Sequence, residues 1–302
     1  MLDFSSKKSI FKDSELTKQF QNEGYVIVPF ITEEQITEIL GVYQKYYPDG
    51  VKGFFTTTFA NNVEHREGVN RSIREVCLER IDELFENYKI LFSSFIVKAP
   101  GKDSELIMHQ DMTLVDERKY SGINIWCPLV DLDDKNGAVE VLPRSHRFFS
   151  TFRGSSIPDI YDDVVPELKT VMKSCKVKAG QAIIFDQSII HYSPPNLSDK
   201  ERPVINTFVA HEDAKIKICY WDKESGNNEI EIFEQEDNFL EQFEQFGHNI
   251  FNRPTIGKSV GKFPYDFPKL SLETVEQEYN VTFPEKKKPV EKKPWLKRLF
   301  AK

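Results

Sequence analysis

The feature that most constrains the fold of this chain is a series of short apolar runs between residues 90 and 210, separated by turn-forming residues. Pro100-Gly101 and Asn136-Gly137 are typical of these separators. No helical pattern alternates with the runs, which argues against parallel βαβ units and favours an antiparallel barrel or sandwich. The expected strands are 90–98, 122–130, 138–142, 175–178, 182–185, 188–192 and 204–210.

Helices are expected on the N-terminal side of this region. Thr32 begins one of them as an N-cap, and Gln35 completes a capping box three residues later. Segment 72–88 carries apolar residues at helical spacing. The expected elements before the strands are helices over 13–22, 32–47 and 72–88, a strand over 24–28 and an irregular segment over 51–70.

The remaining segments define the expected domain organisation. Segment 148–174 is too long for a hairpin turn and is expected to be a partly helical insertion. After a strand over 216–221, we expect a helix with an aromatic core face over 228–245 and a loop over 257–268. The sequence thus predicts one domain over 1–283, divergent in its part 213–283, followed by a basic tail over 284–302.

Composition excludes several classes of protein. The 302 residues carry a net charge of −8, which argues against nucleic-acid binding by the body of the chain. The four cysteines form no CxxC pair, so neither a disulfide framework nor a zinc ribbon is indicated. The first residues lack the apolar core of a signal peptide, and no apolar run has the length of a membrane span. We expect a cytoplasmic protein.

The tail 284–302 differs in charge from the rest. It holds eight Lys or Arg and two Glu, or +6, which leaves −14 for residues 1–283. Trp295, Leu299 and Phe300 stand among its last basic residues and could form a short amphipathic anchor on an anionic membrane. The alternatives are a solvated tail and a tail docked on the acidic body, so any expected membrane contact is peripheral.

Three residues have the types and placement of a metal site. His109 and Asp111 are one residue apart, so their side chains point the same way on an extended backbone. His191 ends the apolar run 182–190, where the mouth of a barrel would lie. Two His and one carboxylate on one face of an octahedron are the ligands of non-haem Fe(II) oxygenases. Alone, His109 and Asp111 could be a polar surface pair, and His191 favours the metal site.

Arg202 begins the next expected strand, eleven residues after His191. We expect an antiparallel hairpin to bring it beside Ser193 and the metal. A guanidinium binds a carboxylate through two hydrogen bonds, so the pair suits the distal carboxylate of 2-oxoglutarate. The alternatives are a surface ion pair for Arg202 and a turn-forming role for Ser193. His146 is expected to satisfy backbone groups in a turn, and His65 is the one other histidine considered for a substrate pocket.

In this order, the motifs resemble those of the phytanoyl-CoA dioxygenase family of Fe(II)/2-oxoglutarate-dependent oxygenases. The likeness extends over about residues 15–212. One departure is Arg144, which stands where the family usually has glycine. The matching motifs are His109-Gln110-Asp111, Trp126, Pro128-Leu129, Asn136-Gly137, Pro143-Arg144-Ser145-His146, His191, Ser193 and Arg202.

The resemblance implies a mainly β fold with flanking helices, in the form of a double-stranded β-helix (jelly-roll, cupin-like). It implies Fe(II) held by His109, Asp111 and His191. It also implies 2-oxoglutarate held by Arg202 and Ser193. Two further residues match positions near that cofactor in the family, Lys98 and Trp126, although core packing would explain Trp126 equally well.

The activity implied by the resemblance is hydroxylation of an aliphatic C–H with O2, with succinate and CO2 as co-products. Asp111 favours hydroxylation over halogenation, since a halogenase would carry a small residue there. The substrate is left open among acyl chains, amino acids, natural-product intermediates and peptidyl side chains. A non-catalytic jelly-roll binding protein would be expected to lose a metal ligand, and a 2-oxoglutarate-independent cupin-type oxygenase would not need Arg202.

Overall fold

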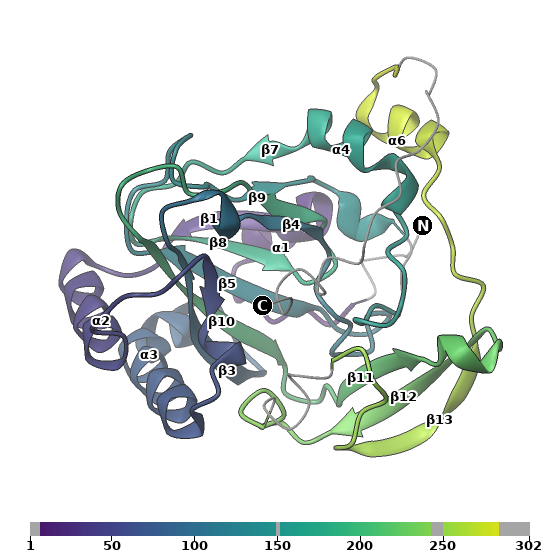
Figure 1. Cartoon of the computed structure of the whole chain (residues 1–302), viewed down its shortest axis with the longest axis horizontal. Helices are drawn as coiled ribbons and strands as arrows, with labels where there is room; N and C mark the ends of the chain where they lie inside the picture. Colours follow the sequence, from purple (N-terminus) through teal and green to yellow (C-terminus); the bar gives the residue numbers. More distant parts are fainter. Residues whose placement is uncertain (1–6, 149–151, 243–249, 284–302) are drawn as a thin grey trace.

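Two antiparallel sheets form the centre of the computed structural model, which describes residues 7–148, 152–242 and 250–283 (Figure 1). The larger sheet has the strand order β1 (Tyr25–Pro29), β8 (Gln181–Asp186), β5 (Gly122–Pro128), β10 (Arg202–His211), β3 (Tyr88–Lys98) and β2 (Phe54–Thr56). The smaller sheet has the order β4 (Leu106–His109), β9 (His191–Ser193), β6 (Glu140–Val141) and β7 (Lys173–Ser174). The expected strand over 138–142 is shortened to β6. The expected strand over 175–178 does not form, and β7 precedes that segment in the chain.

Three helices cover the outer face of the larger sheet, α1 (Ser14–Glu23), α2 (Glu33–Tyr46) and α3 (Val63–Leu84) (Figure 1). The capping box at the start of α2 is present, with Thr32 and Gln35 bonded to each other's backbone N–H groups. The core beneath the helices is apolar on both sides. It includes Ile39, Ile73, Cys77 and Ile81 from the helices and Ile125, Ile184 and Ile205 from the strands. The mainly β fold with helices on one sheet is thus confirmed.

Helix α3 begins earlier than expected, so the irregular segment 51–70 is wrong in its second half. The first turns of α3 bury the polar residues Arg66 and Asn70. Arg66 donates to the Glu241 carbonyl (2.9 Å), and Asn70 donates to the Glu241 carboxylate (2.7 Å). Polar bonds to a distant segment hold these turns, in place of apolar contacts. The apolar periodicity that marks the rest of the helix therefore does not reveal them.

The C-terminal part adds a three-stranded antiparallel sheet, β11 (Ile216–Trp221), β12 (Glu229–Gln235) and β13 (Lys258–Pro264). It lies at the lower right of Figure 1. The expected strand over 216–221 is confirmed, whereas the helix over 228–245 and the loop over 257–268 are wrong where the structure describes them. Glu-Ile-Glu-Ile at 229–232 has the period of two that is typical of a strand, and the acidic composition masked it.

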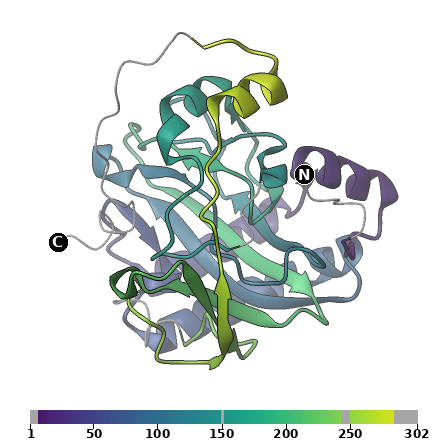
Figure 2. The same ribbon diagram turned by 90° about the vertical axis from the view of Figure 1, so that its right-hand side faces the viewer.

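The insertion 148–174 is partly helical, as expected, and it covers the smaller sheet. It contains α4 (Val165–Val171), which packs beside α6 (Leu272–Tyr279). Figure 2 shows the chain running from β13 along one side of the molecule to α6. Buried residues shared by the insertion, α6 and the smaller sheet are Met108, Leu142, Ile160, Tyr161, Leu168, Ile190 and Val275.

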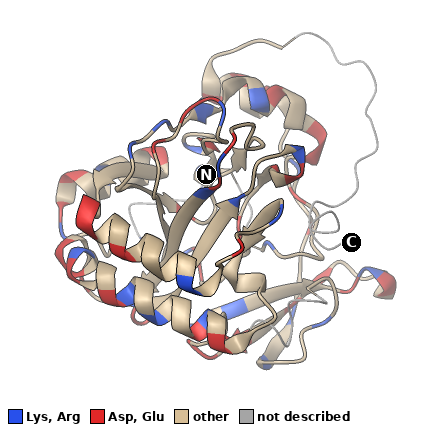
Figure 3. Cartoon of the chain, turned by 60° about the vertical axis from the view of Figure 1, so that its left-hand side comes forward, with Lys and Arg blue, Asp and Glu red and all other residues tan. Residues whose placement is uncertain are grey.

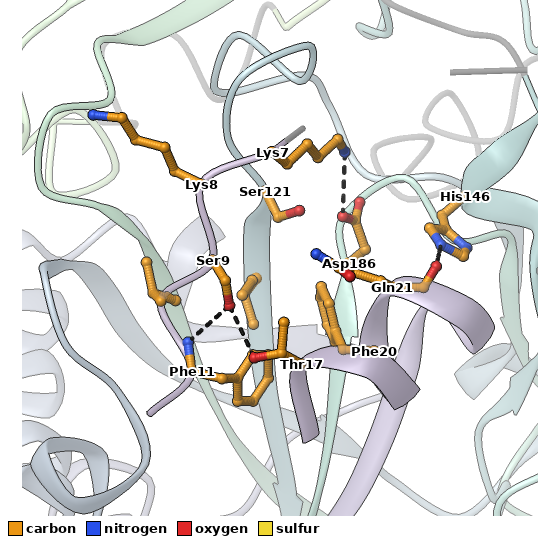
Figure 4. Close-up of a pocket in the computed structure, with 12 residues that line it drawn as sticks. Lys7, Lys8, Ser9, Phe11, Thr17, Phe20, Gln21, Ser121, His146 and Asp186 are labelled. Atoms are coloured by element: carbon orange, nitrogen blue, oxygen red, sulfur yellow. Dashed lines mark hydrogen bonds and ion pairs between the residues drawn. The ribbon is translucent and has the colours of Figure 1, made fainter. Parts of the chain in front are cut away.

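The first described residues are held against the larger sheet by a buried ion pair. Lys7 Nζ lies 3.7 Å from Asp186 Oδ2 at the end of β8 (Figure 4). Burial alone would raise the pKa of Asp186, but Lys7, His146 and hydrogen bonds from Ser188 lower it to about 2. His146 Nε2 lies 3.0 Å from the Gln21 carbonyl oxygen, so this histidine satisfies a backbone group, as expected.

Arg144 has a left-handed backbone conformation, with φ 68°. Glycine is the residue best suited to this conformation, which explains its use at this position in the family that the sequence resembles. Arg144 keeps the turn by bonding to α6, since its Nε donates to the Glu278 carboxylate (2.6 Å) and its Nη2 to the Glu278 carbonyl (3.0 Å).

Arg144→Ala is expected to destabilise the protein more than Arg144→Gly. Both substitutions remove the bonds to Glu278, but only alanine keeps the strain of a positive φ, about 1 kcal/mol. Thermal unfolding should place the melting temperature of the alanine variant roughly 2 °C below that of the glycine variant. Equal melting temperatures would show that the backbone strain at this position is negligible.

The surface of the described chain carries charges of both signs. Lys and Arg stand between Asp and Glu along the exposed faces of the helices (Figure 3). The four cysteines are buried and form no disulfide. Within the described residues, no helix combines the length and apolar character needed to cross a membrane. The tail 284–302 lies outside these residues, so its contact with a membrane surface stays a prediction, as do the domain limits.

Candidate metal and cofactor site

The three predicted metal ligands lie together on the smaller sheet. His109 ends β4 directly opposite His191, which begins β9, and Asp111 follows β4. One ligand atom from each residue lies within 4.8 Å of the other two. The two imidazole centroids are 4.0 Å apart, and His109 Nε2 lies 3.7 Å from Asp111 Oδ1. The backbone therefore presents two imidazoles and a carboxylate to one point.

In both histidines the hydrogen bond of Nδ1 places the lone pair on Nε2, the atom that can bind a metal. His109 Nδ1 lies 2.8 Å from the Ile107 carbonyl oxygen, and His191 Nδ1 lies 3.1 Å from that of Ile189. A carbonyl only accepts, so Nδ1 carries the proton and the lone pair is on Nε2. Burial and then the neighbouring His191 lower the pKa of His109 well below its usual value, which keeps this imidazole neutral, as a metal ligand must be.

Two asparagines that the sequence interpretation missed orient the carboxylate of Asp111. Asn124 Nδ2, on β5, donates to Asp111 Oδ2 (2.6 Å), and Asn206 Nδ2, on β10, donates to Asn124 Oδ1 (2.9 Å). A carboxylate only accepts, so both amides must be oriented in this way. Desolvation raises the pKa of Asp111, while His191, Asn124 and Arg153 act to lower it. An amide within the apolar run 122–128 was the signal that could have identified Asn124.

Two buried cations lie opposite each other on neighbouring strands. Lys98 on β3 is 0% exposed, its cross-strand partner Arg202 on β10 is 1% exposed, and Arg202 lies over the ring of Trp126 at 5.2 Å. Lys98 Nζ donates to the carbonyls of Ser193 (2.7 Å) and Pro194 (2.6 Å). In the described part of the chain, Arg202 Nε has no hydrogen-bond partner and neither cation forms an ion pair.

The environment of these cations disfavours their charged forms. Burial, and then the charge of Arg202, lowers the pKa of Lys98 to about 6. Burial lowers the pKa of Arg202 to about 9. Within the described residues neither group has a carboxylate partner, so a bound carboxylate would raise the pKa of both and favour their charged forms.

Ser193 and Arg202 reach this pocket from different sheets. Ser193 ends β9 in the smaller sheet and Arg202 begins β10 in the larger one, so the expected hairpin between them is wrong. Ser193 Oγ donates to the carbonyl of Gly137 (2.9 Å). Gly137 has φ +75°, and a Cβ atom there would lie 2.5 Å from the Pro194 carbonyl oxygen, so this position needs glycine.

A cavity of about 150 Å³ joins the metal ligands to the cations. All seven predicted site residues line it, namely Lys98, His109, Asp111, Trp126, His191, Ser193 and Arg202. His65 does not line it and packs against the ring of Tyr46 instead, with centroids 5.3 Å apart.

A buried ion pair from the insertion supports the segment that carries the metal ligands. Arg153 Nε donates to the backbone carbonyl of Asp111 (2.7 Å), and its two terminal nitrogens bond to the carboxylate of Glu117. Gln187 Nε2 also donates to Glu117 (2.8 Å). No sequence pattern pointed to Arg153 or Glu117, because they belong to no local motif and meet only in the folded chain.

Comparison with known proteins points to the same family as the sequence motifs. A model of the family described as phytanoyl-CoA dioxygenase (PhyH) matches residues 20–204. The chain is similar to phytanoyl-CoA dioxygenase of Arabidopsis thaliana, with 29% identity over 143 residues, 45% of this chain and 48% of that protein. It is also similar to phytanoyl-CoA dioxygenase domain-containing protein 1 of Danio rerio, with 27% identity over 199 residues, 61% and 60% of the two chains. The chain thus spans about half to three fifths of these relatives.

Two solved structures share the architecture. The non-haem alpha-ketoglutarate dependent carbocyclase SnoK from nogalamycin biosynthesis matches with a TM-score of 0.50 and 18% identity, over 68% of this chain and 86% of that chain. EctD from S. alaskensis, solved with 2-oxoglutarate and 5-hydroxyectoine, matches with a TM-score of 0.51 and 16% identity, over 71% and 83%. These likenesses confirm the expected jelly-roll fold. Because the family model covers more than half of the 302 residues, this chain belongs to the phytanoyl-CoA dioxygenase family.

Proposed function

We propose that the protein is an Fe(II)- and 2-oxoglutarate-dependent dioxygenase that hydroxylates an aliphatic C–H of a small-molecule or acyl substrate. The observation that carries the proposal is the pair of buried cations, Lys98 and Arg202, beside the cluster of His109, Asp111 and His191. Burying unpaired cations is unfavourable by several kcal/mol, so an anionic ligand is the natural completion of the pocket. A keto acid with two carboxylates can serve both the metal and the cations.

The donor set fits Fe(II). Two neutral imidazoles and one carboxylate are the facial ligand set of non-haem iron oxygenases, and they leave coordination positions open. Calcium sites need more oxygen ligands, and a catalytic zinc site with the same three donors would not require the two cations beside it. His109, Asp111 and His191 would therefore hold the iron.

When bound, Fe(II) and 2-oxoglutarate supply the chemistry, in which one oxygen atom of O2 enters succinate as CO2 is released and the other enters the substrate C–H bond. The chain orients and shields the reactants. Arg202 would bind the distal carboxylate of 2-oxoglutarate with Ser193 and Lys98 beside it, and Trp126 would keep water from the guanidinium. Asn124 holds Asp111 in one orientation through its amide N–H.

The proposal is tested by measuring 2-oxoglutarate binding by calorimetry without O2, and succinate formation in air with ascorbate. His109→Ala and Asp111→Ala should lose the metal. Arg202→Ala should keep the metal but weaken 2-oxoglutarate binding about 100-fold, because it removes one partner of a buried charged pair. Arg118→Ala is the matched control, since Arg118 is 69% exposed and pairs only on the surface with Asp116.

Failure of the metal-loaded wild type to bind 2-oxoglutarate would reject the proposal. Consumption of O2 without 2-oxoglutarate would then identify a cupin-type oxygenase. Absence of any O2 consumption across the substrate classes would favour a non-catalytic jelly-roll binding protein.

A further inference from the structure

The face of the larger sheet that lines the cavities changes from charged to polar to apolar along the adjacent strands β5, β10 and β3. The charged end, Lys98 and Arg202, belongs to the cofactor pocket. The apolar end, Phe92 and Phe208, lines a second cavity of about 170 Å³. The inward residues in order are Lys98, Ile96, Ser94 and Phe92 on β3, Arg202, Val204, Asn206 and Phe208 on β10, and Trp126 and Asn124 on β5.

The second cavity adjoins the metal site. Asp111, Asn124 and Asn206 line both cavities, so a group in the second cavity lies next to a metal ligand. Four of its lining residues come from beyond the residues matched by the family model, namely Asn206, Phe208, Leu240 and Ile250. This part of the chain therefore gives the protein a substrate wall that the family likeness does not predict.

The size and charge of the second cavity limit what can enter it. An engineered apolar cavity of roughly 150 Å³ binds one benzene molecule, so about 170 Å³ suits a group of one ring. Asp111 is its one charged lining residue within the described chain, and Asp111 is committed to the metal. An ammonium, carboxylate or phosphate entering the cavity would therefore lose its hydration without gaining a counter-ion of the protein.

Four residues with hydroxyl groups line the second cavity, namely Thr56, Thr58, Ser94 and Ser155. The hydroxyls of Thr56 and Thr58 bond each other (3.2 Å), whereas within the described residues those of Ser94 and Ser155 are left to bond a ligand. Of these two residues, Ser94 lies on the sheet beside Asn206, which also lines the cofactor pocket.

Ser94 is 3% exposed and lines the cavity opposite its cross-strand partner Asn206. Its hydroxyl has no hydrogen-bond partner among the described residues. The adjacent Ser93 points to the other face of the sheet, where its hydroxyl is bonded to that of Thr207 (2.9 Å). Ser94 is thus placed to bond a polar atom of whatever fills the cavity.

We propose that the substrate inserts an uncharged, ring-sized apolar group bearing one hydroxyl or carbonyl oxygen, with the apolar part against Phe92, Phe208 and Leu240 and the oxygen on Ser94. The inference rests on the proposed function and narrows its substrate class. It excludes a zwitterionic free amino acid and the phosphate-bearing end of an acyl-CoA from this cavity. A neutral part of a larger molecule can enter while its charged part remains outside.

The test uses four probes with the same ring, namely benzyl alcohol, toluene, benzylammonium and benzoate. Each is titrated into protein loaded with Mn(II) and saturated with 2-oxoglutarate, with Zn(II) protein as the diamagnetic reference. Paramagnetic relaxation of the probe protons shows whether the ring is next to the metal. Benzyl alcohol is expected to bind at least about tenfold more tightly than either charged probe, and about fivefold more tightly than toluene.

Variants separate the roles of the hydroxyl and the cavity. Ser94→Ala should abolish the preference for benzyl alcohol over toluene, whereas the matched control Ser93→Ala should keep it. Leu240→Trp should block all four probes by filling the cavity. Binding of 2-oxoglutarate, measured on the same samples, shows that each variant is folded at the cofactor pocket.

Several outcomes would overturn this inference alone. They are normal 2-oxoglutarate binding with no relaxation of any probe, equal binding of the charged probes, or an unchanged preference in Ser94→Ala. Loss of 2-oxoglutarate binding in the wild type would instead reject the proposed function on which the inference rests.

Discussion

The affinity of the metal-loaded protein for 2-oxoglutarate is expected to fall about tenfold for each unit of pH between pH 7 and pH 9. Burial and Arg202 lower the pKa of Lys98 to about 6, so without ligand the amine is mostly neutral in this range. A dicarboxylate beside it favours the ammonium form, and binding must therefore take up a proton. Calorimetry in two buffers of different ionisation enthalpy should detect uptake of about one proton at pH 8.

The same group should make the free protein more stable as the pH rises. The pKa of Lys98, about 6 in the folded state, lies below the value of about 10.4 expected when unfolded, so the unfolded chain binds more protons between these limits. The free energy of unfolding should then increase by about 1.4 kcal/mol per pH unit in this window from Lys98 alone. Urea unfolding at pH 7, 8 and 9 measures the slope.

Lys98→Met provides the control for both measurements. It should weaken 2-oxoglutarate binding, remove the proton uptake and make the binding nearly independent of pH. It should also remove the contribution of Lys98 to the rise of the unfolding free energy with pH. The variant should also be more stable than the wild type at pH 7, because methionine has no charge to desolvate. Identical pH dependences in the two proteins would mean that Lys98 stays protonated in the free site.

The metal ligands were predictable from the sequence because coordination chemistry restricts both residue type and spacing. His109 and Asp111 need only an extended backbone to point the same way, and the end of an apolar run placed His191. The cation pair was predictable only in part. Arg202 meets Lys98 through the register of β10 with β3, which is a tertiary fact, and the local hairpin expected from the spacing of Ser193 and Arg202 does not form.

The errors in the fold have a common cause, which is polar residues at buried or paired positions. The start of α3 is held by hydrogen bonds of Arg66 and Asn70 to Glu241, and an apolar pattern cannot reveal such bonds. In β12, Glu231 alternates with the core residue Ile230 and is covered by Arg253, which leaves it only 6% exposed, so an acidic segment forms a central strand. Hydrophobic periodicity fails wherever hydrogen bonds and ion pairs replace apolar burial.

Arg153→Met is expected to lower the free energy of unfolding by about 3–5 kcal/mol, because it leaves the buried carboxylate of Glu117 without its counter-charge. The two side chains are only 5% and 4% exposed, so water cannot replace the guanidinium. Arg118→Met is the matched control on the surface, where loss of the bond to Asp116 should cost about 0–1 kcal/mol. Urea unfolding of the metal-free proteins measures both.

The effect of Arg153 on the metal site is separable from its effect on stability. Arg153 Nε bonds the backbone carbonyl of Asp111, so Arg153→Met should also weaken metal binding about 10- to 100-fold. Adding Glu117→Gln to Arg153→Met removes the unpaired charge and should recover most of the stability, but not the metal affinity. If the double variant regained neither, the loss would come from packing of the insertion. If it regained both, the bond to Asp111 would have no part in placing the ligand.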